Sequence, residues 1–453
     1  MGEHDVIVIG AGPAGEVCAG RLAAEGLDVA LVERELVGGE CAFWACMPSK
    51  ALLRPAELLA EVARVPGARE AVTAELDVAA ALARRDQVIH DLDDSVQLPW
   101  IEDRDITLVR GQARLEGERR VRVGDRLLQA RRAVVIAVGS GAAMPPVSGL
   151  AELAPWTNRQ GTTANRVPDR LTVIGGGAVG CELAQAWATL GSRVFLVEAL
   201  PRLLATEEPF ASQQLLEALR ERNVDVRLGA RATGAARQGE DWLLTLADGS
   251  ELRSDELLVA VGRKPHTDDL GLETVDLEPG ATIRVDDQMR VPGRDWLFAI
   301  GDVNGRALLT HAGKYQARVA AGAIMNRDAH AVWDGELSPR VVFSEPQIAA
   351  VGQTLEHALA AGLEARAVDA DIASTPGASF IGKGAPAGAR LVVDEQRRVL
   401  VGATFTGPEV AEWLQAATIA IVGEVPLERL IHAIPAFPTR SEVWLKLLAD
   451  WDF

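Results

Sequence analysis

Residues 6–33 read VIVIGAGPAGEVCAGRLAAEGLDVALVE, and residues 171–198 read LTVIGGGAVGCELAQAWATLGSRVFLVE. Each stretch begins with a run rich in β-branched residues, passes through Gly-x-Gly-x-x-Gly, continues as an Ala- and Leu-rich helix and ends as an apolar strand. Since this is the order of a βαβ unit, the chain is predicted to contain that unit twice. The two copies align without a gap, and the coinciding positions are Gly10, Gly12, Gly15 and Glu33 in the first and Gly175, Gly177, Gly180 and Glu198 in the second.

The repeated glycines are typical of a dinucleotide-binding turn. The first glycine allows a tight turn, the second lets a pyrophosphate approach the backbone, and the third lets helix and strand pack closely. The helix start adds free N–H groups and the positive end of its dipole. The terminal Glu accepts hydrogen bonds from a ribose diol, and the charge of Glu198 would also repel a 2′-phosphate, which favours NADH over NADPH.

The composition indicates a soluble globular protein whose partners are small molecules. The chain has 453 residues, a formal net charge of −18 and four cysteines. This length exceeds one core, and the acidity argues against nucleic acid or an anionic membrane as the principal partner. No apolar stretch approaches the roughly 20 residues of a membrane helix, and the start MGEHDVIVIG lacks a basic signal region, so we expect a cytoplasmic protein with no membrane partner.

A cysteine-containing loop follows the first repeat, where residues 38–50 read GGECAFWACMPSK. Cys41 and Cys46 are close enough in the sequence to bridge if they lie at the start of a helix. A zinc site would need two more ligands at similar spacing. Cys18 and Cys181 lie inside the predicted helices, where we expect small buried apolar residues, so no metal site is expected.

With these motifs, the chain resembles the FAD-dependent pyridine nucleotide-disulfide oxidoreductases, the family of dihydrolipoamide dehydrogenase, glutathione reductase, mercuric reductase and soluble transhydrogenase. The resemblance covers essentially the whole chain. Besides the repeats and the cysteine loop, it is carried by AVGS at 137–140, VGRKP at 261–265, AIGD at 299–302, LLTHAG at 308–313 and FSEPQIAAVG at 343–352.

The resemblance implies an α/β fold with two Rossmann-like dinucleotide-binding domains, one for FAD and one for NAD, and a C-terminal α+β dimerisation domain. It also implies a homodimer, formed through that last domain. The implied segments are 1–147 for the first part of the FAD-binding domain, 148–262 for the NAD(P)-binding domain, 263–333 for the second part of the FAD-binding domain and 334–453 for the dimerisation domain.

The resemblance also assigns residues to the cofactors and to catalysis. The implied FAD-binding residues are Gly10, Gly12, Gly15, Glu33, Gly39, Lys50, Gly139, Asp302 and His311, and the implied nicotinamide dinucleotide residues are Gly175, Gly177, Gly180, Glu198 and Gly262. Lys50 resembles the lysine near the flavin ring, which pairs with a glutamate that aligns with Glu182 and holds a positive charge there. An acid in the first turn of its helix is the alternative for Glu182. In the implied redox-active disulfide, Cys46 is the thiolate nearest the flavin, and Cys41 is the more exposed sulfur that attacks the acceptor.

The C-terminal segment departs from the family, whose members carry a His as general base for the attacking thiol and a Glu that orients it. Residues 430–448 read LIHAIPAFPTRSEVWLKLL. Aligning the final acid with Glu442 places Phe437 where the base belongs, and His432 stands outside that register. Glu442, expected to be catalytic from the resemblance, has a second interpretation, because Thr439 to Glu442 reads as a capping box before the last helix.

Two residues of the cysteine loop depart from the family as well. Glu40 would raise the pKa of the thiols, and Trp44 would restrict access to them, unless both serve local packing. These departures affect the thiol-dependent half of the reaction and leave the expected FAD and NAD sites unchanged.

Three functions are consistent with these residues. The first is an NADH-dependent flavoenzyme that passes electrons through Cys41 and Cys46 to a disulfide or related small acceptor. In the second, a quinone, dye or transhydrogenase-type flavin reductase, the cysteine pair is not the substrate-reducing group. The third is a flavoprotein subunit of a larger complex. We adopt the first, with an acceptor other than an ordinary glutathione-like disulfide.

Overall fold

The computed structural model describes residues 2–335, 337–382 and 384–451. The chain forms two compact units, each built from three separate stretches. Unit 1 consists of Met1–Pro48, Arg85–Ala143 and Arg263–Ser338, and unit 2 of Ser49–Arg84, Met144–Gly262 and Pro339–Phe453. The predicted α/β class is confirmed, since each glycine motif belongs to a sheet with parallel strands. The finer domain division expected at residues 147, 262 and 333 stays a prediction.

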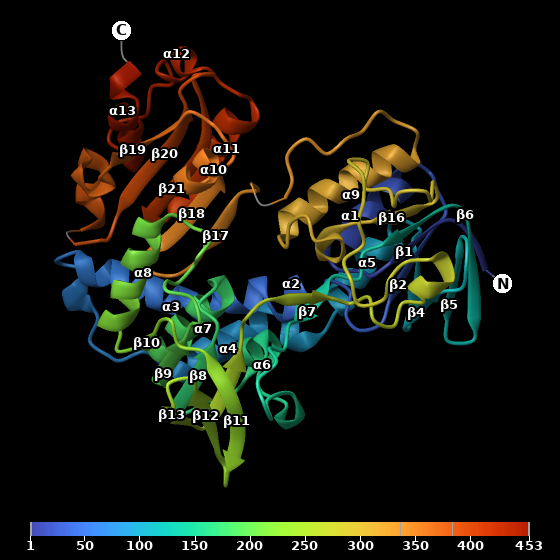
Figure 1. Cartoon of the computed structure of the whole chain (residues 1–453), viewed down its shortest axis with the longest axis horizontal. Coiled ribbons are helices and arrows are strands. Elements are labelled where there is room, and N and C mark those ends of the chain that lie inside the picture. Colours follow the sequence, from blue (N-terminus) through green and yellow to red (C-terminus); the bar gives the residue numbers. More distant parts are fainter. Residues whose placement is uncertain (1, 336, 383, 452–453) are drawn as a thin grey trace. The chain divides into compact units, whose positions relative to one another are not determined.

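Unit 1 is organised around one large sheet with the strand order β3-β2-β1-β6-β5-β4, and β16 pairs with β6 (Figure 1). The pairs that involve β1, β2, β3 and β16 are parallel, whereas β4, β5 and β6 form an antiparallel meander. The strands are β1 (Gly2–Ile9), β2 (Val29–Glu33), β3 (Thr107–Arg110), β4 (Ala113–Leu115), β5 (Arg120–Val123), β6 (Arg126–Ile136), β7 (Ser140–Ala142), β15 (Arg263–Pro265) and β16 (Leu297–Ala299). The helices are α1 (Pro13–Ala24), α2 (Gly39–Phe43), α5 (Leu98–Glu102) and α9 (Thr310–Ile324).

The first repeat forms the predicted βαβ unit from β1, α1 and β2. Helix α1 begins at Pro13, a favoured first helical residue because the N–H that proline lacks would have no partner within the helix. The helix is followed by Gly26, whose φ of +80° suits a helix end. Cys18 and Leu22 are fully buried, which confirms Cys18 as a small apolar core residue. Helix α9 packs beside α1 (Figure 1).

Unit 2 contains the second repeat as β8, α7 and β9, in a parallel four-stranded sheet of order β10-β9-β8-β14. A three-stranded antiparallel sheet, β11-β12-β13, is inserted between β10 and β14. The strands are β8 (Arg170–Ile174), β9 (Arg193–Val197), β10 (Asp225–Arg227), β11 (Ala232–Gln238), β12 (Asp241–Leu246), β13 (Glu251–Ser254) and β14 (Glu256–Val259). The helices are α6 (Asn158–Thr163), α7 (Ala178–Thr189) and α8 (Pro209–Glu221). A boundary between the two units falls after Pro48 within α3 (Cys46–Arg64), and another after Arg84 within α4 (Val78–Val88).

The rest of unit 2, from Pro339 on, has the α+β character that its sequence predicts. Its five strands form an antiparallel sheet of order β17-β18-β21-β20-β19, and α11 packs against β18 and β21. These elements are β17 (Arg340–Val342), β18 (Gln347–Gly352), α10 (Leu355–Ala360), β19 (Ala365–Ala370), β20 (Gly388–Asp394), β21 (Val399–Gly407), α11 (Val410–Val422), α12 (Leu427–Leu430) and α13 (Val443–Leu447).

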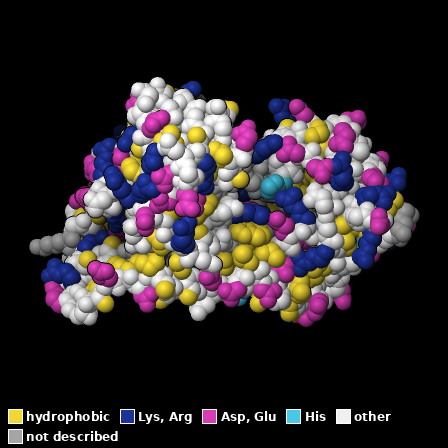
Figure 2. Space-filling view, turned by 90° about the horizontal axis from the view of Figure 1, so that it is seen from below, with side chains coloured by type: hydrophobic (Ala, Val, Ile, Leu, Met, Phe, Trp, Pro, Cys, Tyr) yellow, Lys and Arg dark blue, Asp and Glu magenta, His cyan; other side chains and the backbone are white. Residues whose placement is uncertain are grey.

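The surface carries charges of both signs. On the face shown in Figure 2, acidic and basic side chains are interspersed, although the chain is acidic as a whole. Within residues 2–335, 337–382 and 384–451, no helix combines the length and apolar character that crossing a bilayer requires. Over the same residues, no three His, Cys, Asp or Glu side chains are arranged to hold a metal ion.

Candidate active site

The first glycine motif forms a turn in which two of the three glycines are required by close backbone contacts. Gly10 has a φ of +103°, and a Cβ there would lie 2.4 Å from the carbonyl oxygen of Ala137. A Cβ on Gly15 would lie 1.8 Å from the carbonyl oxygen of Gly10. A Cβ on Gly12, by contrast, would meet no described protein atom within 4 Å. Gly12 therefore leaves open space at the start of α1, which fits a bound pyrophosphate.

Glu33 ends β2, is buried, and accepts backbone hydrogen bonds on both carboxylate oxygens. Its Oε2 accepts from the Ala11 N–H at 2.7 Å, and its Oε1 accepts from the Glu35 N–H at 2.7 Å. The carboxylate therefore holds the glycine turn in place. Each oxygen retains lone-pair capacity, so the predicted role of Glu33 toward a ribose diol is compatible with these two bonds.

The second motif repeats this arrangement in unit 2. A Cβ on Gly175 would lie 2.4 Å from the Ala260 carbonyl oxygen, and one on Gly180 would lie 1.8 Å from the Gly175 carbonyl oxygen. Gly177 again faces space with no described protein atom within 4 Å of a built Cβ. Glu198 accepts from the Gly176 N–H at 2.5 Å, and its other oxygen accepts from the Leu200 N–H at 2.7 Å. Gly262, at the end of the stretch that contains β14, has a φ of +147°.

Asp302 lies in the short 3-10 turn after β16, where two other polar side chains hold it. The Ser140 hydroxyl donates to Asp302 Oδ2 at 2.5 Å, and Arg263 Nε lies 3.4 Å from the same oxygen. Ser140 and Arg263 meet because β7 pairs with β15. Neither residue was predicted as a site residue, although each lies in a motif that carried the resemblance.

The other predicted FAD residues of unit 1 have distinct surroundings. Gly39 has a φ of +58°, and a Cβ there would lie 2.9 Å from Gly12 Cα, so the start of α2 packs directly on the glycine turn. Gly139, with a φ of +67°, faces space in which a Cβ would meet no described atom. His311 is exposed in the first turn of α9. Their roles toward FAD stay predictions.

The cysteine loop forms two helices with a break between them, since α2 ends at Phe43 and α3 begins at Cys46. Both sulfur atoms lie beside the hydroxyl of Thr310, the first residue of α9. Thr310 Oγ1 donates to Cys41 Sγ at 3.2 Å and lies 3.5 Å from Cys46 Sγ. The structure thus brings the two predicted cysteines together. Thr310 was not predicted, because LLTHAG identified its segment without indicating a role for its hydroxyl.

The surroundings of the pair disfavour ionisation of Cys41. The hydrogen bond with Cys46 raises the pKa of the Cys41 thiol well above its ordinary value, and burial raises it further. Thr310 and Lys314, one turn later on α9, lower the same pKa. The charge of an ionised Cys46 would raise the pKa of Cys41 as well. The buried Cys18 differs, because burial alone raises its pKa to about 12.

Two residues of the cysteine loop, Glu40 and Trp44, were predicted to affect the thiols. The Glu40 carbonyl accepts from the Trp44 N–H at 2.9 Å, and the ring of Trp44 lies 5.8 Å from that of Phe43, centroid to centroid. The Trp44 indole therefore takes part in local packing. The expected effects of Glu40 on thiol pKa and of Trp44 on access stay predictions.

Lys50 and Glu182 form the ion pair that the resemblance implies. Lys50 Nζ donates to Glu182 Oε2 at 2.8 Å, and the second carboxylate oxygen accepts from the Phe343 N–H at 2.9 Å. The ammonium also lies 4.8 Å from the centroid of the Phe343 ring. The side chain of Glu182 is 5% exposed and that of Lys50 36%, so the carboxylate is the buried partner.

The C-terminal segment places no imidazole in the register of the family base. Phe437 is 77% exposed, and His432 is exposed as well. Glu442 accepts from the Thr439 N–H at 3.2 Å, and the Thr439 side chain caps the N–H of Glu442 in return, which confirms the predicted capping box. The same carboxylate oxygen accepts from the Gly377 N–H at 3.1 Å. This local role accounts for Glu442, and a catalytic role stays a prediction.

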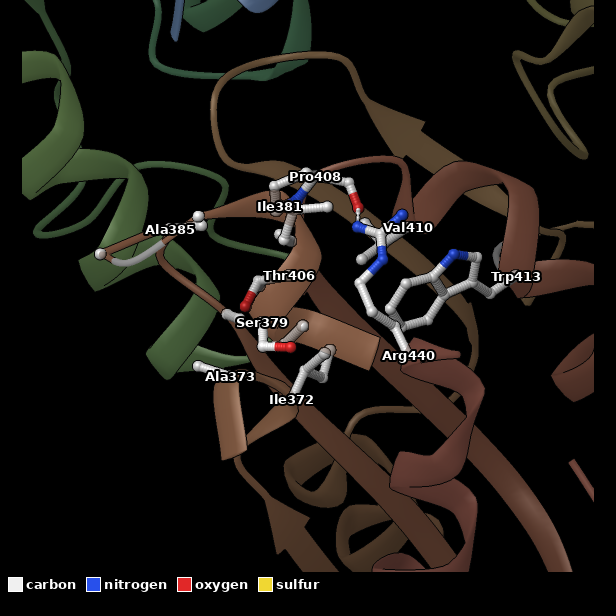
Figure 3. Close-up of a pocket in the computed structure, with 15 residues that line it drawn as sticks. Ile372, Ala373, Ser379, Ile381, Ala385, Thr406, Pro408, Val410, Trp413 and Arg440 are labelled. Atoms are coloured by element: carbon white, nitrogen blue, oxygen red, sulfur yellow. Dashed lines mark hydrogen bonds between the residues drawn. The ribbon is translucent and has the colours of Figure 1, made fainter. Parts of the chain in front are cut away.

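A cavity of about 330 Å³ lies in the C-terminal part of unit 2 (Figure 3). It is lined by Ile372, Ala373, Ala378, Ser379, Ile381, Gly382, Gly384, Ala385, Ala387, Thr406, Gly407, Pro408, Val410, Trp413 and Arg440. The Arg440 guanidinium stacks 4.6 Å from the Trp413 ring and bonds to the Pro408 carbonyl and to Glu409. None of the described lining residues is a predicted cofactor or catalytic residue, so the cavity is separate from that chemistry.

Comparisons with known proteins identify the family of the chain. The family model described as "Pyridine nucleotide-disulphide oxidoreductase" matches residues 4–322, and the model of its dimerisation domain matches residues 338–448. The dihydrolipoyl dehydrogenase of Thermus scotoductus is 34% identical, over 98% of this chain and 96% of that protein. Dihydrolipoyl dehydrogenase 3 of Pseudomonas aeruginosa is 33% identical, over 99% of this chain and 98% of that protein. Among solved structures, the HOCl-induced flavoprotein disulfide reductase RclA of Escherichia coli is similar with a TM-score of 0.86 and 25% identity, covering 98% of this chain and 99% of that chain.

Proposed function

Because the chain belongs to the pyridine nucleotide-disulphide oxidoreductase family, whose members use FAD and NAD(P)H, we propose that it reduces a small disulfide or related acceptor with electrons from NADH, through Cys41 and Cys46. The observation that carries this proposal is the position of both sulfur atoms beside one hydroxyl, that of Thr310. Two thiols held this way are suited to forming and breaking a disulfide in each turnover.

The first glycine motif would hold FAD, with Gly10, Gly12 and Gly15 at the pyrophosphate and Glu33 at the ribose. Asp302, which accepts a hydrogen bond from Ser140, would hold the ribityl chain. When bound, FAD supplies the two-electron chemistry that links a nicotinamide to a disulfide. We assign to Lys50 the task of keeping a positive charge near the flavin ring, in the orientation that the buried Glu182 carboxylate gives it.

The second motif would hold the nicotinamide dinucleotide, and Glu198 would set its preference for NADH. A ribose diol donates hydrogen bonds to a carboxylate, whereas a 2′-phosphate is repelled by it. The backbone bonds that Glu198 accepts from Gly176 and Leu200 fix this charge beside the glycine turn. A higher kcat/KM with NADPH than with NADH would contradict the assignment.

The acceptor is the finer part of the proposal. The relatives named dihydrolipoyl dehydrogenase make a lipoyl-type disulfide the first acceptor to assay. Phe437 in the place of the family base argues for an acceptor that does not need an imidazole to activate the attacking thiol. The protein would work as a cytoplasmic homodimer, in keeping with the match of residues 338–448 to a dimerisation domain.

The test is anaerobic titration of the holoenzyme with NADH. We expect uptake of about four electrons per FAD, two by the flavin and two by the disulfide, and alkylation of Cys41 and Cys46 only after reduction. Cys41→Ala and Cys46→Ala should each lower the uptake to that of the flavin alone. Cys18→Ala, a matched change at a buried cysteine of the same unit, should leave it unchanged. Uptake by the flavin alone in the unaltered protein would contradict the proposal.

A second candidate is direct reduction of a quinone, dye or second nucleotide by the flavin, with the cysteine pair not involved. The exposed Phe437 in the place of the base favours it. Both candidates predict NADH oxidation, but only this one predicts quinone reductase activity that survives in Cys41→Ala. Quinone reduction that is lost in that variant would exclude the second candidate.

A further inference from the structure

The Thr310 hydroxyl is placed to serve both sulfurs of the cysteine pair. Its oxygen lies 3.2 Å from Cys41 Sγ and 3.5 Å from Cys46 Sγ. A hydroxyl has one donor and two acceptor positions, and its proton rotates to suit its neighbours. The hydrogen bond to Cys41 is donated by Thr310, whereas in the contact with Cys46 either atom can be the donor.

A purely structural role does not account for this hydroxyl. Thr310 is the first residue of α9, but the N-cap residue is Leu309 and no side chain caps this helix. The hydroxyl is therefore directed at sulfur rather than at the free N–H groups of the helix start. Lys314, one turn further along α9, adds a positive charge that lowers the pKa of Cys41 together with Thr310.

The proposed reaction needs negative charge first on one sulfur and then on the other. Two-electron reduction of the disulfide, with uptake of one proton, leaves one thiolate and one thiol. The Cys41 proton passes to the Cys46 thiolate, and the Cys41 thiolate so formed attacks an acceptor R–S–S–R′, which forms a Cys41–SR bond and releases R′S⁻. The Cys46 thiol gives its proton to R′S⁻, and the resulting Cys46 thiolate attacks Cys41 sulfur, which re-forms the disulfide and releases RS⁻. The charge thus passes from Cys41 to Cys46 within one turnover.

We propose that Thr310 is a catalytic residue that stabilises the thiolate at either cysteine, turning its single proton toward whichever sulfur carries the charge. This inference rests on the proposed function, because it matters only if both cysteines act in turn. It also explains how the chain works without an imidazole in the register of the family base. A hydroxyl that stabilises the thiolate opposes the rise in the pKa of Cys41 that Cys46 and burial cause, and so makes the thiol proton easier to remove without a base.

The test measures how readily each cysteine ionises in the holoenzyme reduced with tris(2-carboxyethyl)phosphine. The rate of alkylation by iodoacetamide is followed against pH in two single-thiol backgrounds, Cys46→Ala and Cys41→Ala, and the modified residue is located by mass spectrometry. In both backgrounds, Thr310→Val should move the profile up by about one pH unit, which slows alkylation about ten-fold near neutral pH. The rates should converge at high pH, where access rather than ionisation limits them.

Thr310→Ser is the matched control, because it keeps the hydroxyl, and it should retain the original profile within about two-fold. Thr310→Ala also removes the hydroxyl, with a smaller side chain. It is used in place of Thr310→Val if a lower FAD content or a lower thermal stability shows that Val disturbs α9. An unchanged profile for the hydroxyl-free variants in both backgrounds would overturn the proposal. A shift confined to one cysteine would overturn the shared role.

The phosphine step separates this inference from the proposed function. Reduction by phosphine does not involve NADH, so the profiles report on Thr310 even if NADH fails to reduce the disulfide. If NADH reduces only the flavin, the proposed function fails. If NADH reduces both the flavin and the disulfide, but the alkylation profiles do not change when the Thr310 hydroxyl is removed, the proposed function stands and this inference fails.

Discussion

In the two glycine-rich repeats, equivalent glycines make equivalent backbone contacts. The φ angle is +103° at Gly10 and +110° at Gly175, and a Cβ on either would lie 2.4 Å from a carbonyl oxygen. Each terminal acid, Glu33 or Glu198, accepts two backbone N–H bonds that hold its turn. The same short sequence therefore builds the same cradle twice, although one copy lies in a sheet of seven strands and the other in a sheet of four.

The repeats differ in the side chains that follow the turn. Glu16 of the first helix aligns with Cys181 of the second, and Val17 aligns with Glu182. Burial raises the pKa of Glu16 to about 7, while the Cys181 thiol is fully buried and its pKa is raised well above the ordinary value. Glu182 instead binds Lys50. The two repeats thus share the backbone turn at which a dinucleotide would bind. They differ in the side chains of the first turn of the following helix, α1 or α7.

The largest expected effect comes from adding one methyl group to a glycine of either turn. In Gly15→Ala the new Cβ has no room, since it would lie 1.8 Å from a carbonyl oxygen, so the turn must deform and FAD should be lost. Gly180→Ala should keep FAD but lower kcat/KM for NADH by about 1,000-fold. Flavin absorbance and steady-state rates measure the two outcomes.

The matched controls for those variants are Gly12→Ala and Gly177→Ala. Their Cβ atoms would meet no described protein atom within 4 Å, so the thermal stability of the cofactor-free fold should not change. Cofactor affinity should still fall by about 10- to 100-fold, because the methyl group occupies space that a pyrophosphate needs. If cofactor binding were unaffected in both controls, the open space at these glycines would not be where a dinucleotide lies.

The second prediction tests whether the two terminal acids, Glu33 and Glu198, each serve a different cofactor. Glu198→Gln keeps an acceptor for one of the two backbone N–H groups and removes the charge, so the preference for NADH over NADPH should fall by about 100-fold. Glu33→Gln should lower FAD content and leave that preference unchanged. Ratios of kcat/KM for the two nucleotides decide the matter, and an equal shift in both variants would break the assignment of one acid to each cofactor.

The third effect concerns the position at which the first repeat has Val17 and the second has Glu182. Lys50→Met leaves the Glu182 carboxylate buried without its cation and should cost about 3 kcal/mol of unfolding free energy. Glu182→Val, which gives the second repeat the residue of the first, leaves the more exposed ammonium without its carboxylate and the Phe343 N–H without its acceptor, and should cost about 2 kcal/mol. Denaturant unfolding of both single variants and of the double variant measures the coupling.

In that double-mutant cycle, the double variant should be no less stable than Lys50→Met, because neither charge remains. Additive losses would mean that the ion pair contributes nothing beyond its separate side chains. The rate at which NADH reduces the flavin should fall about ten-fold in each single variant if the positive charge also assists that step.

Whether a feature could be predicted from the sequence depends on how far apart the interacting residues lie along the chain. The two glycine turns, the capping box at Thr439 and Glu442 and the burial of Cys18 depend on neighbours in the chain, and the structure confirms them. The ion pair of Lys50 and Glu182 joins distant residues and was accessible only through the family resemblance.

The remaining contacts depend on how distant segments pack. Thr310 meets Cys41 across 269 positions of the chain, and Ser140 meets Asp302 across 162. No local spacing or periodicity encodes such a contact, since hydroxyls of this kind occur throughout the sequence. The sequence therefore identified the two cysteines but not the hydroxyl that lies between them.

The smallest effect uses Glu16 and its counterpart Cys181. Burial raises the pKa of Glu16 to about 7, the Glu33 charge raises it too, and Lys314 opposes the shift. Since the folded protein binds this proton more tightly than the unfolded chain, the stability that it contributes is present at low pH and is lost as pH rises from about 4.5 to about 7. Glu16→Gln removes this loss, so the variant should gain up to about 2 kcal/mol relative to the unaltered protein at about pH 8 and little at about pH 5.

The counterpart change, Cys181→Ser, should alter stability by the same amount at both pH values, because a thiol whose pKa is raised by burial stays neutral throughout this range. Denaturant unfolding of the FAD-bound proteins at the two pH values gives the comparison. A pH-independent difference for Glu16→Gln would show that Glu16 is already ionised in the fold. The first repeat would then carry a permanent charge beside Glu33, and the contrast between the two helices would lie in charge rather than in a titration near neutral pH.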